Sequence, residues 1–131
     1  MKKLVTVFER RNYTSNADGS AQFYEMDLTL VDTLGAAKDI LWQVFVYDRT
    51  TNAKLTITPV HGSDPKRRPA SPGGGVGLAA QTLNATLALG AQAVHTTSGP
   101  FLARMELTLK VEGSGALEGV ECAVFATLTY T

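Results

Sequence analysis

The residues that could carry out chemistry are few in this chain, and their spacing matches no catalytic motif. The two histidines, His61 and His95, have no cysteine or aspartate cluster at the spacing that metal ligands require. No serine lies in the Gly-x-Ser-x-Gly context of a hydrolase nucleophile. Glu25 and Asp27 share one face of a predicted strand, but a solvated strand face explains such a pair better than acid–base catalysis does. We therefore predict that the protein is not an enzyme and holds no metal and no cofactor.

Two further features have simple structural explanations. The glycine run at residues 73–77 lacks the Lys-Ser/Thr that ends a phosphate-binding loop. Cys122 is the only cysteine, so no disulfide can form within the chain. It falls on the apolar side of a predicted strand, and we expect a small buried hydrophobe rather than a nucleophile.

Positive charge gathers in two sets of residues. The first is a triplet flanked by prolines, Lys66, Arg67 and Arg68. The second is a set that strand alternation places on polar faces, Lys54, Arg104, Thr108 and Lys110. Lysine plus arginine equals aspartate plus glutamate at 12 each, so nucleic-acid binding needs locally segregated charge. The second set is our candidate contact to a phosphate backbone, and the alternative is an ordinary solvated sheet face.

The elements that must position these residues are predicted to be strands. Apolar side chains recur at every second residue, which is the period of a half-buried strand. Seven segments are assigned in this way, at residues 4–11, 23–31, 40–47, 54–60, 78–89, 105–111 and 120–130. The segment at 78–89 also fits a helix, and the first two strands are expected to pair as a hairpin. The sequence predicts one all-β domain over residues 1–131, an antiparallel sheet or sandwich of about seven strands with little or no helix.

Two segments stand out from this pattern. The strand at 40–47 is apolar on both faces, so it is either central in a sandwich or covered by a second molecule. Residues 32–39 before it are expected to form a connection. The segment at 61–77 has three prolines and five glycines, which predicts an irregular loop. Long loops in compact domains are usually functional, and we expect this one to contact a neighbouring subunit.

Two stretches of the chain resemble the central strands of the coat proteins of single-stranded RNA bacteriophages. One is Arg-Thr-Thr-Asn-Ala-Lys-Leu-Thr-Ile at 49–57, which follows the apolar strand at 42–47, and the other is Met-Glu-Leu-Thr-Leu at 105–109. The resemblance implies an N-terminal hairpin, a curved antiparallel sheet, and a dimer whose sheet faces the genome. Those proteins usually end in helices that clasp the partner subunit, whereas this chain ends in the predicted strand at 120–130.

We interpret the chain as a structural subunit that assembles with copies of itself into a viral or phage shell. It would be assembled in the host cytoplasm and reside in the virion, with single-stranded RNA as a further partner and no membrane partner. The expected subunit-interface residues are Trp42, Phe45, Tyr47, Lys66, Arg67 and Arg68. The alternative is a monomeric β-sandwich that binds a carbohydrate, for which Tyr13 is the aromatic side chain best placed in the sequence.

Overall fold

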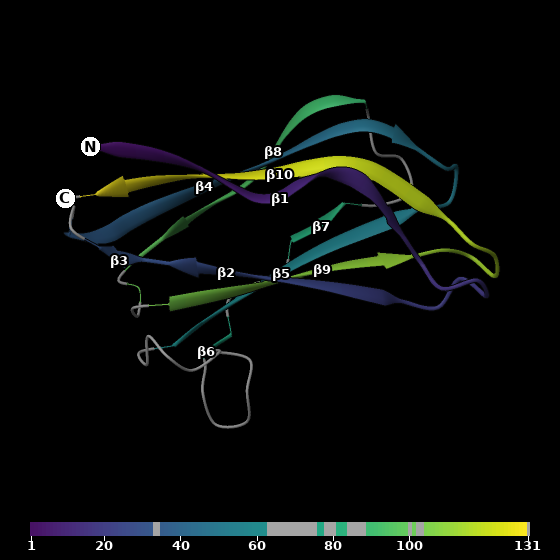
Figure 1. Ribbon diagram of the computed structural model, residues 1–131, viewed down its shortest axis with the longest axis horizontal. Coiled ribbons are helices and arrows are strands. Elements are labelled where there is room, and N and C mark those ends of the chain that lie inside the picture. Colours follow the sequence, from purple (N-terminus) through teal and green to yellow (C-terminus); the bar gives the residue numbers. More distant parts are fainter. Residues whose placement is uncertain are drawn as a thin grey trace.

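The computed structural model describes residues 1–32, 35–62, 76–77, 81–83, 89–99, 101 and 104–130 as two antiparallel sheets packed face to face. The first, here called the β4 sheet, contains β1 (Lys2–Thr14), β10 (Gly119–Tyr130), β4 (Gly35–Arg49), β8 (Gly90–Ser98) and β3 (Val31–Asp32). The second, the β9 sheet, contains β2 (Gln22–Thr29), β9 (Arg104–Glu112), β5 (Lys54–Gly62), β6 (Val76–Gly77) and β7 (Gln81–Leu83). Figure 1 shows them as an upper and a lower layer. The expected all-β sandwich is confirmed.

The order of the strands is that of a jelly roll. The β4 sheet runs β1-β10-β4-β8 and the β9 sheet runs β2-β9-β5-β7. Successive long strands therefore cross from one sheet to the other, from β1 to β2, from β4 to β5, and from β8 to β9 to β10. This interleaving of four strands from each sheet, with β3 and β6 as short additional strands, is the double-sheet jelly roll, one of the ways in which antiparallel proteins limit free strand edges.

The predicted hairpin between the first two strands is wrong. β1 pairs with β10 and β2 pairs with β9, so the two strands belong to different sheets. The connection between them contains a turn in which the Gly19 N–H donates to the Asn16 carbonyl at 2.9 Å. It is held to the β9–β10 connection, where the Gly113 N–H donates to the Gly19 carbonyl at 2.9 Å. Closeness in sequence made the strands neighbours in space but did not make them hydrogen-bonded partners.

Several expected boundaries also differ. Residues 32–39 were expected to connect two strands, yet β3 includes Asp32 and β4 begins at Gly35. The small residues at the start of β4 pair with the end of β10, and Ala37, for example, pairs with Tyr130. Of the expected loop at 61–77, His61 and Gly62 belong to β5 and Val76 and Gly77 form β6, while residues 63–75 lie outside the described part. Within 78–89 the described strand is β7.

β8 was not predicted. Its sequence begins Ala-Gln-Ala after Gly90 and ends in threonines and a serine, so no bulky apolar alternation marks it. It forms along β4, pairing from Asp39↔Ser98 to Val46↔Gly90. β8 therefore forms because β4, a long central strand, offers its hydrogen-bonding edge, although the local sequence of β8 has no clear strand pattern.

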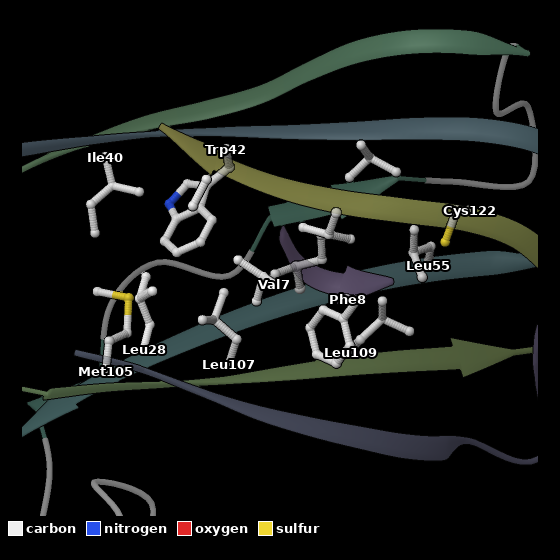
Figure 2. Close-up of a cluster of buried hydrophobic side chains, with 14 of the residues drawn as sticks. Val7, Phe8, Leu28, Ile40, Trp42, Leu55, Met105, Leu107, Leu109 and Cys122 are labelled. Carbon is white, nitrogen blue, oxygen red and sulfur yellow. The ribbon is translucent and has the colours of Figure 1, made fainter. Parts of the chain in front are cut away.

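The core lies between the two sheets and is built chiefly by β4 and β9. Inward residues of β9 are fully buried, among them Leu107 and Leu109. Facing them from β4 is Trp42, at 2% exposure, between Ile40 and Val44. Figure 2 shows Ile40 and Trp42 on one side of the middle of the sandwich and Leu107 and Leu109 on the other. Burying each large apolar side chain contributes about 1.5–3 kcal/mol, so this layer is the main source of stability.

Replacing Leu107 by alanine should lower the free energy of unfolding by about 2–5 kcal/mol, because the side chain is fully buried and leaves a cavity. Thr108→Ala is the matched control on the opposite face of β9 and should cost less than about 1 kcal/mol. Urea unfolding followed by far-ultraviolet circular dichroism measures both. Equal losses in the two variants would contradict the assignment of the two faces.

Candidate functional site

The outward face of β4 separates the predicted interface aromatics into two groups. Trp42 points into the core and is 2% exposed, so its predicted role in a subunit contact is wrong. Phe45 is 37% exposed and Tyr47 is partly exposed, because residues of opposite parity point away from the core. The prediction that this strand is apolar on both faces is correct, but one of the faces is covered by the β9 sheet of the same molecule.

Apolar side chains from three neighbouring strands lie on this outer surface, with the polar Gln43 and Thr127 among them. Phe45 lies across from Ala123 of β10, and Thr127 of β10 lies between Leu4 of β1 and Leu41 of β4. Leu4 is 66% exposed. We call this surface the outer apolar patch and define it as Leu4, Leu41, Phe45, Tyr47, Ala123 and Phe125.

A charged residue from β1 covers one end of the patch. The Arg10 guanidinium lies 3.7 Å from the centre of the Tyr47 ring, and that ring lies 4.8 Å from the Phe45 ring. Arg10 Nε donates to Glu121 Oε2 at 2.9 Å. Because the Arg10 charge is already paired, covering this end of the patch removes no isolated charge from water. Stacked Arg and aromatic side chains of this kind dominate the binding energy of many protein interfaces.

The basic triplet Lys66, Arg67 and Arg68 lies outside the described residues. Its predicted subunit contact therefore stays a prediction.

The predicted nucleic-acid contacts do come together on the outer face of the β9 sheet. Arg104, Thr108 and Lys110 share the outward face of β9, with Glu106 between Arg104 and Thr108, and Lys54 of β5 lies across from Glu112. The grouping that alternation indicated is therefore present.

Carboxylates neutralise this face. Arg104 forms a 2.5 Å ion pair with Asp27 of β2, and Lys110 forms a 3.1 Å ion pair with Glu112. The described ionic residues that are at least partly exposed on the face are three cations (Lys54, Arg104, Lys110) and three carboxylates (Glu25, Asp27, Glu112), and Glu106 on the same side of β9 is buried. Glu106 and Glu112 lie on the same side of β9 as Arg104, so the alternation in the sequence already placed these two carboxylates beside the cations. Glu25 and Asp27 come to the same face because β2 pairs with β9. The described face presents no positive field to a phosphate backbone.

Tyr13 is not the exposed platform that a carbohydrate site would need. It lies on the inward side of the end of β1 with 2% exposure, and its hydroxyl donates to the Glu9 carbonyl at 2.6 Å. Its ring meets that of Tyr24 edge to face at 4.9 Å. Burial is the main cause that raises the pKa of Tyr13 to about 12. The first predicted strand ended at residue 11, but β1 extends through Tyr13 to Thr14.

Cys122 is a buried hydrophobe, as predicted. It is fully buried on the inward face of β10, and desolvation raises the pKa of its thiol to about 12. Within the described part of the chain, no group of three His, Cys, Asp or Glu side chains is placed to hold a metal ion. In the same residues, no helix long and apolar enough to cross a bilayer is found.

No family model and no curated protein matches this chain. Among solved structures, the VP2 subviral particle of infectious bursal disease virus matches with a TM-score of 0.53 and 9% identity over 97% of this chain and 32% of that chain. The structure of the Gx strain of the same virus matches with a TM-score of 0.52 and 10% identity over 97% and 31%. A carbohydrate-binding module specific for non-crystalline cellulose gives a TM-score of 0.48 and 12% identity over 88% and 69%. The chain spans about a third of the viral chains, and the likeness concerns the fold alone.

The free energy of unfolding should fall as the pH rises from about 9 towards 12. The pKa of the Cys122 thiol is raised from 9.0 to about 12 and that of Tyr13 from 10.0 to about 12, so the folded state holds both protons more tightly than the unfolded state. Their stabilisation is complete below the unfolded values and is lost above them. Urea unfolding at stepped pH measures the slope. Cys122→Ala should make the slope shallower between pH 9 and 11, and an unchanged slope in that variant would contradict the buried thiol.

Proposed function

We propose that this protein is a structural, non-enzymatic subunit that self-assembles into a capsid-like shell, with the outer apolar patch as one of the contacts between subunits. The observation that carries the proposal is an aromatic-rich surface, centred on Phe45, left open on the outside of a complete sandwich. The domain already has a full core, so these side chains are not needed to build it. The jelly-roll fold and the likeness of that fold to a protein of a subviral particle support the proposal.

The size of the patch favours a weak pairwise contact. Covering the exposed parts of Leu4 and Phe45 contributes about 2–3 kcal/mol for each copy, from about 1.5–3 kcal/mol for a fully covered side chain. Two copies meeting face to face therefore gain about 4–6 kcal/mol from these residues, near the lower end of the roughly 4–15 kcal/mol that association costs. A single contact of this kind is barely stable, and several contacts per subunit make a closed assembly stable.

The shape of the surface also suits sheet packing. The patch spans β1, β10 and β4, which lie side by side without interruption. Sheets of this kind pack face to face at about 10 Å, with side chains interdigitating. The same patch on a second subunit is the simplest partner, since identical surfaces meet across a twofold axis.

The proposal places the protein in a virion assembled in the host cytoplasm, with copies of itself as the main partner. RNA contact is a separate and weaker part of it. The charge-neutralised face of the β9 sheet gives RNA little to bind. The basic triplet at 66–68 is the better candidate for meeting phosphates, on its sequence alone.

Phe45→Glu should abolish assembly, because it would bury a charge in the centre of the contact. Phe23→Glu is the matched control, an aromatic residue of 58% exposure on the other sheet, and should assemble like the unchanged protein. Size-exclusion chromatography with light scattering measures particle mass, and absorbance at 260 and 280 nm reports packaged nucleic acid. A monomer at high micromolar concentration for the unchanged protein would refute the proposal.

A further inference from the structure

A groove runs along the edge where the two sheets part. β1 is the last strand of the β4 sheet and β2 is the last strand of the β9 sheet, and both lie at the same edge of the sandwich. The groove between them has a volume of about 460 Å³, within the range of binding sites for small molecules and peptide side chains. Its lining includes Val7, Phe8 and Glu9 of β1 and Tyr24, Glu25 and Met26 of β2.

The groove has an apolar floor and one closed end. Val7 and Phe8 are adjacent yet both buried, because the register of β1 against β10 shifts at this point. Met26 comes from the inward side of β2 and is nevertheless 43% exposed, so an apolar side chain of the core face is left uncovered. The Tyr24 hydroxyl donates to the Thr14 carbonyl at 3.1 Å and fixes the end of the groove.

One wall of the groove is a strand edge that can accept another strand. β2 pairs with β9 over eight consecutive residues without a register shift, and it has no described partner on its other side. In an antiparallel edge strand, every second residue points its N–H and C=O away from the sheet. Protected edges carry prolines, bulges or charged side chains, lysine above all. β2 has no proline, no lysine and no bulge, and its two charged side chains are the carboxylates of Glu25 and Asp27. β1, in contrast, is interrupted by two register shifts.

The charges on the rim decide which ligand fits. Glu9 and Glu25 are exposed carboxylates on opposite walls, and the Arg11 guanidinium lies 5.1 Å and 5.4 Å from the ring centres of Tyr13 and Tyr24. The exposed Glu9 carboxylate on this rim favours a basic ligand over an anionic one. A second β2 strand fits poorly, because pairing of like strands brings the carboxylates of Glu25 and Asp27 close to each other.

We propose that β2 binds an extended basic peptide of a partner protein by strand addition. The peptide backbone pairs with the free edge of β2, and its alternate apolar side chains enter the groove above Val7, Phe8 and Met26. Its lysines or arginines face Glu9. The added strand completes the sandwich at the edge where the two sheets leave it open, which is the recognition mode known as β-augmentation.

The test uses the full-length protein and a fluorescein-labelled peptide, acetyl-Lys-Val-Lys-Ile-Lys-Val-Lys-amide, with binding followed by fluorescence anisotropy. We expect saturable binding that weakens at least tenfold when alternate peptide nitrogens are methylated on the edge facing β2. Replacing the lysines of the peptide by glutamates should abolish binding. Glu9→Lys should weaken binding about twofold to fivefold, as loss of one exposed charge pair does.

Glu118→Lys is the matched control, a carboxylate in the β9–β10 connection away from the groove, and should leave the affinity unchanged. Amide chemical shifts in nuclear magnetic resonance spectra should change in β2. Equal binding of the methylated peptide, equal effects of Glu9→Lys and Glu118→Lys, or shifts confined to other strands would each overturn the proposal. Self-association that Glu25→Lys alters without any peptide would place a second copy on this edge and overturn it as well.

Discussion

The burial of one side of β4 against one side of β9 is the interaction on which the rest of the structure depends. Each strand contributes a row of apolar side chains at every second residue, and the two rows meet across the middle of the sandwich. Once this layer is formed, the opposite parity of each strand is fixed as outer surface. The outer apolar patch and the charge-neutralised face are both direct results of that parity. A shift of one residue in either strand would exchange core and surface.

The same constraint explains how much could be predicted from the sequence. The alternation in β9 and β10 was long and regular, and their inward residues were identified correctly. β8 was missed because alanine and threonine give no contrast between its faces. The pairing of β1 with β10 joins the two ends of the chain, and local pattern carries no information on such distant partners. Fold class was therefore accessible from the sequence, and topology was not.

The candidate sites were predictable to the extent that they lie on one strand. Arg104, Thr108 and Lys110 were grouped correctly because they share a strand and a parity. What alternation could not supply was the neighbouring strand, which brings Asp27 beside Arg104 and changes the charge of the face. The groove between β1 and β2 escaped prediction for the same reason, since each of its walls belongs to a different sheet.

The position of Trp42 has a consequence for how this protein can be observed. It is the only tryptophan and is buried inside the sandwich, whereas the Phe45 ring on the outer surface is exposed to water. Its fluorescence emission should lie at short wavelength and move to the red when a subunit loses its tertiary structure. Events confined to the outside of the molecule leave that environment untouched. Intrinsic tryptophan emission therefore serves as an internal reference for intact subunits while other probes follow their surfaces.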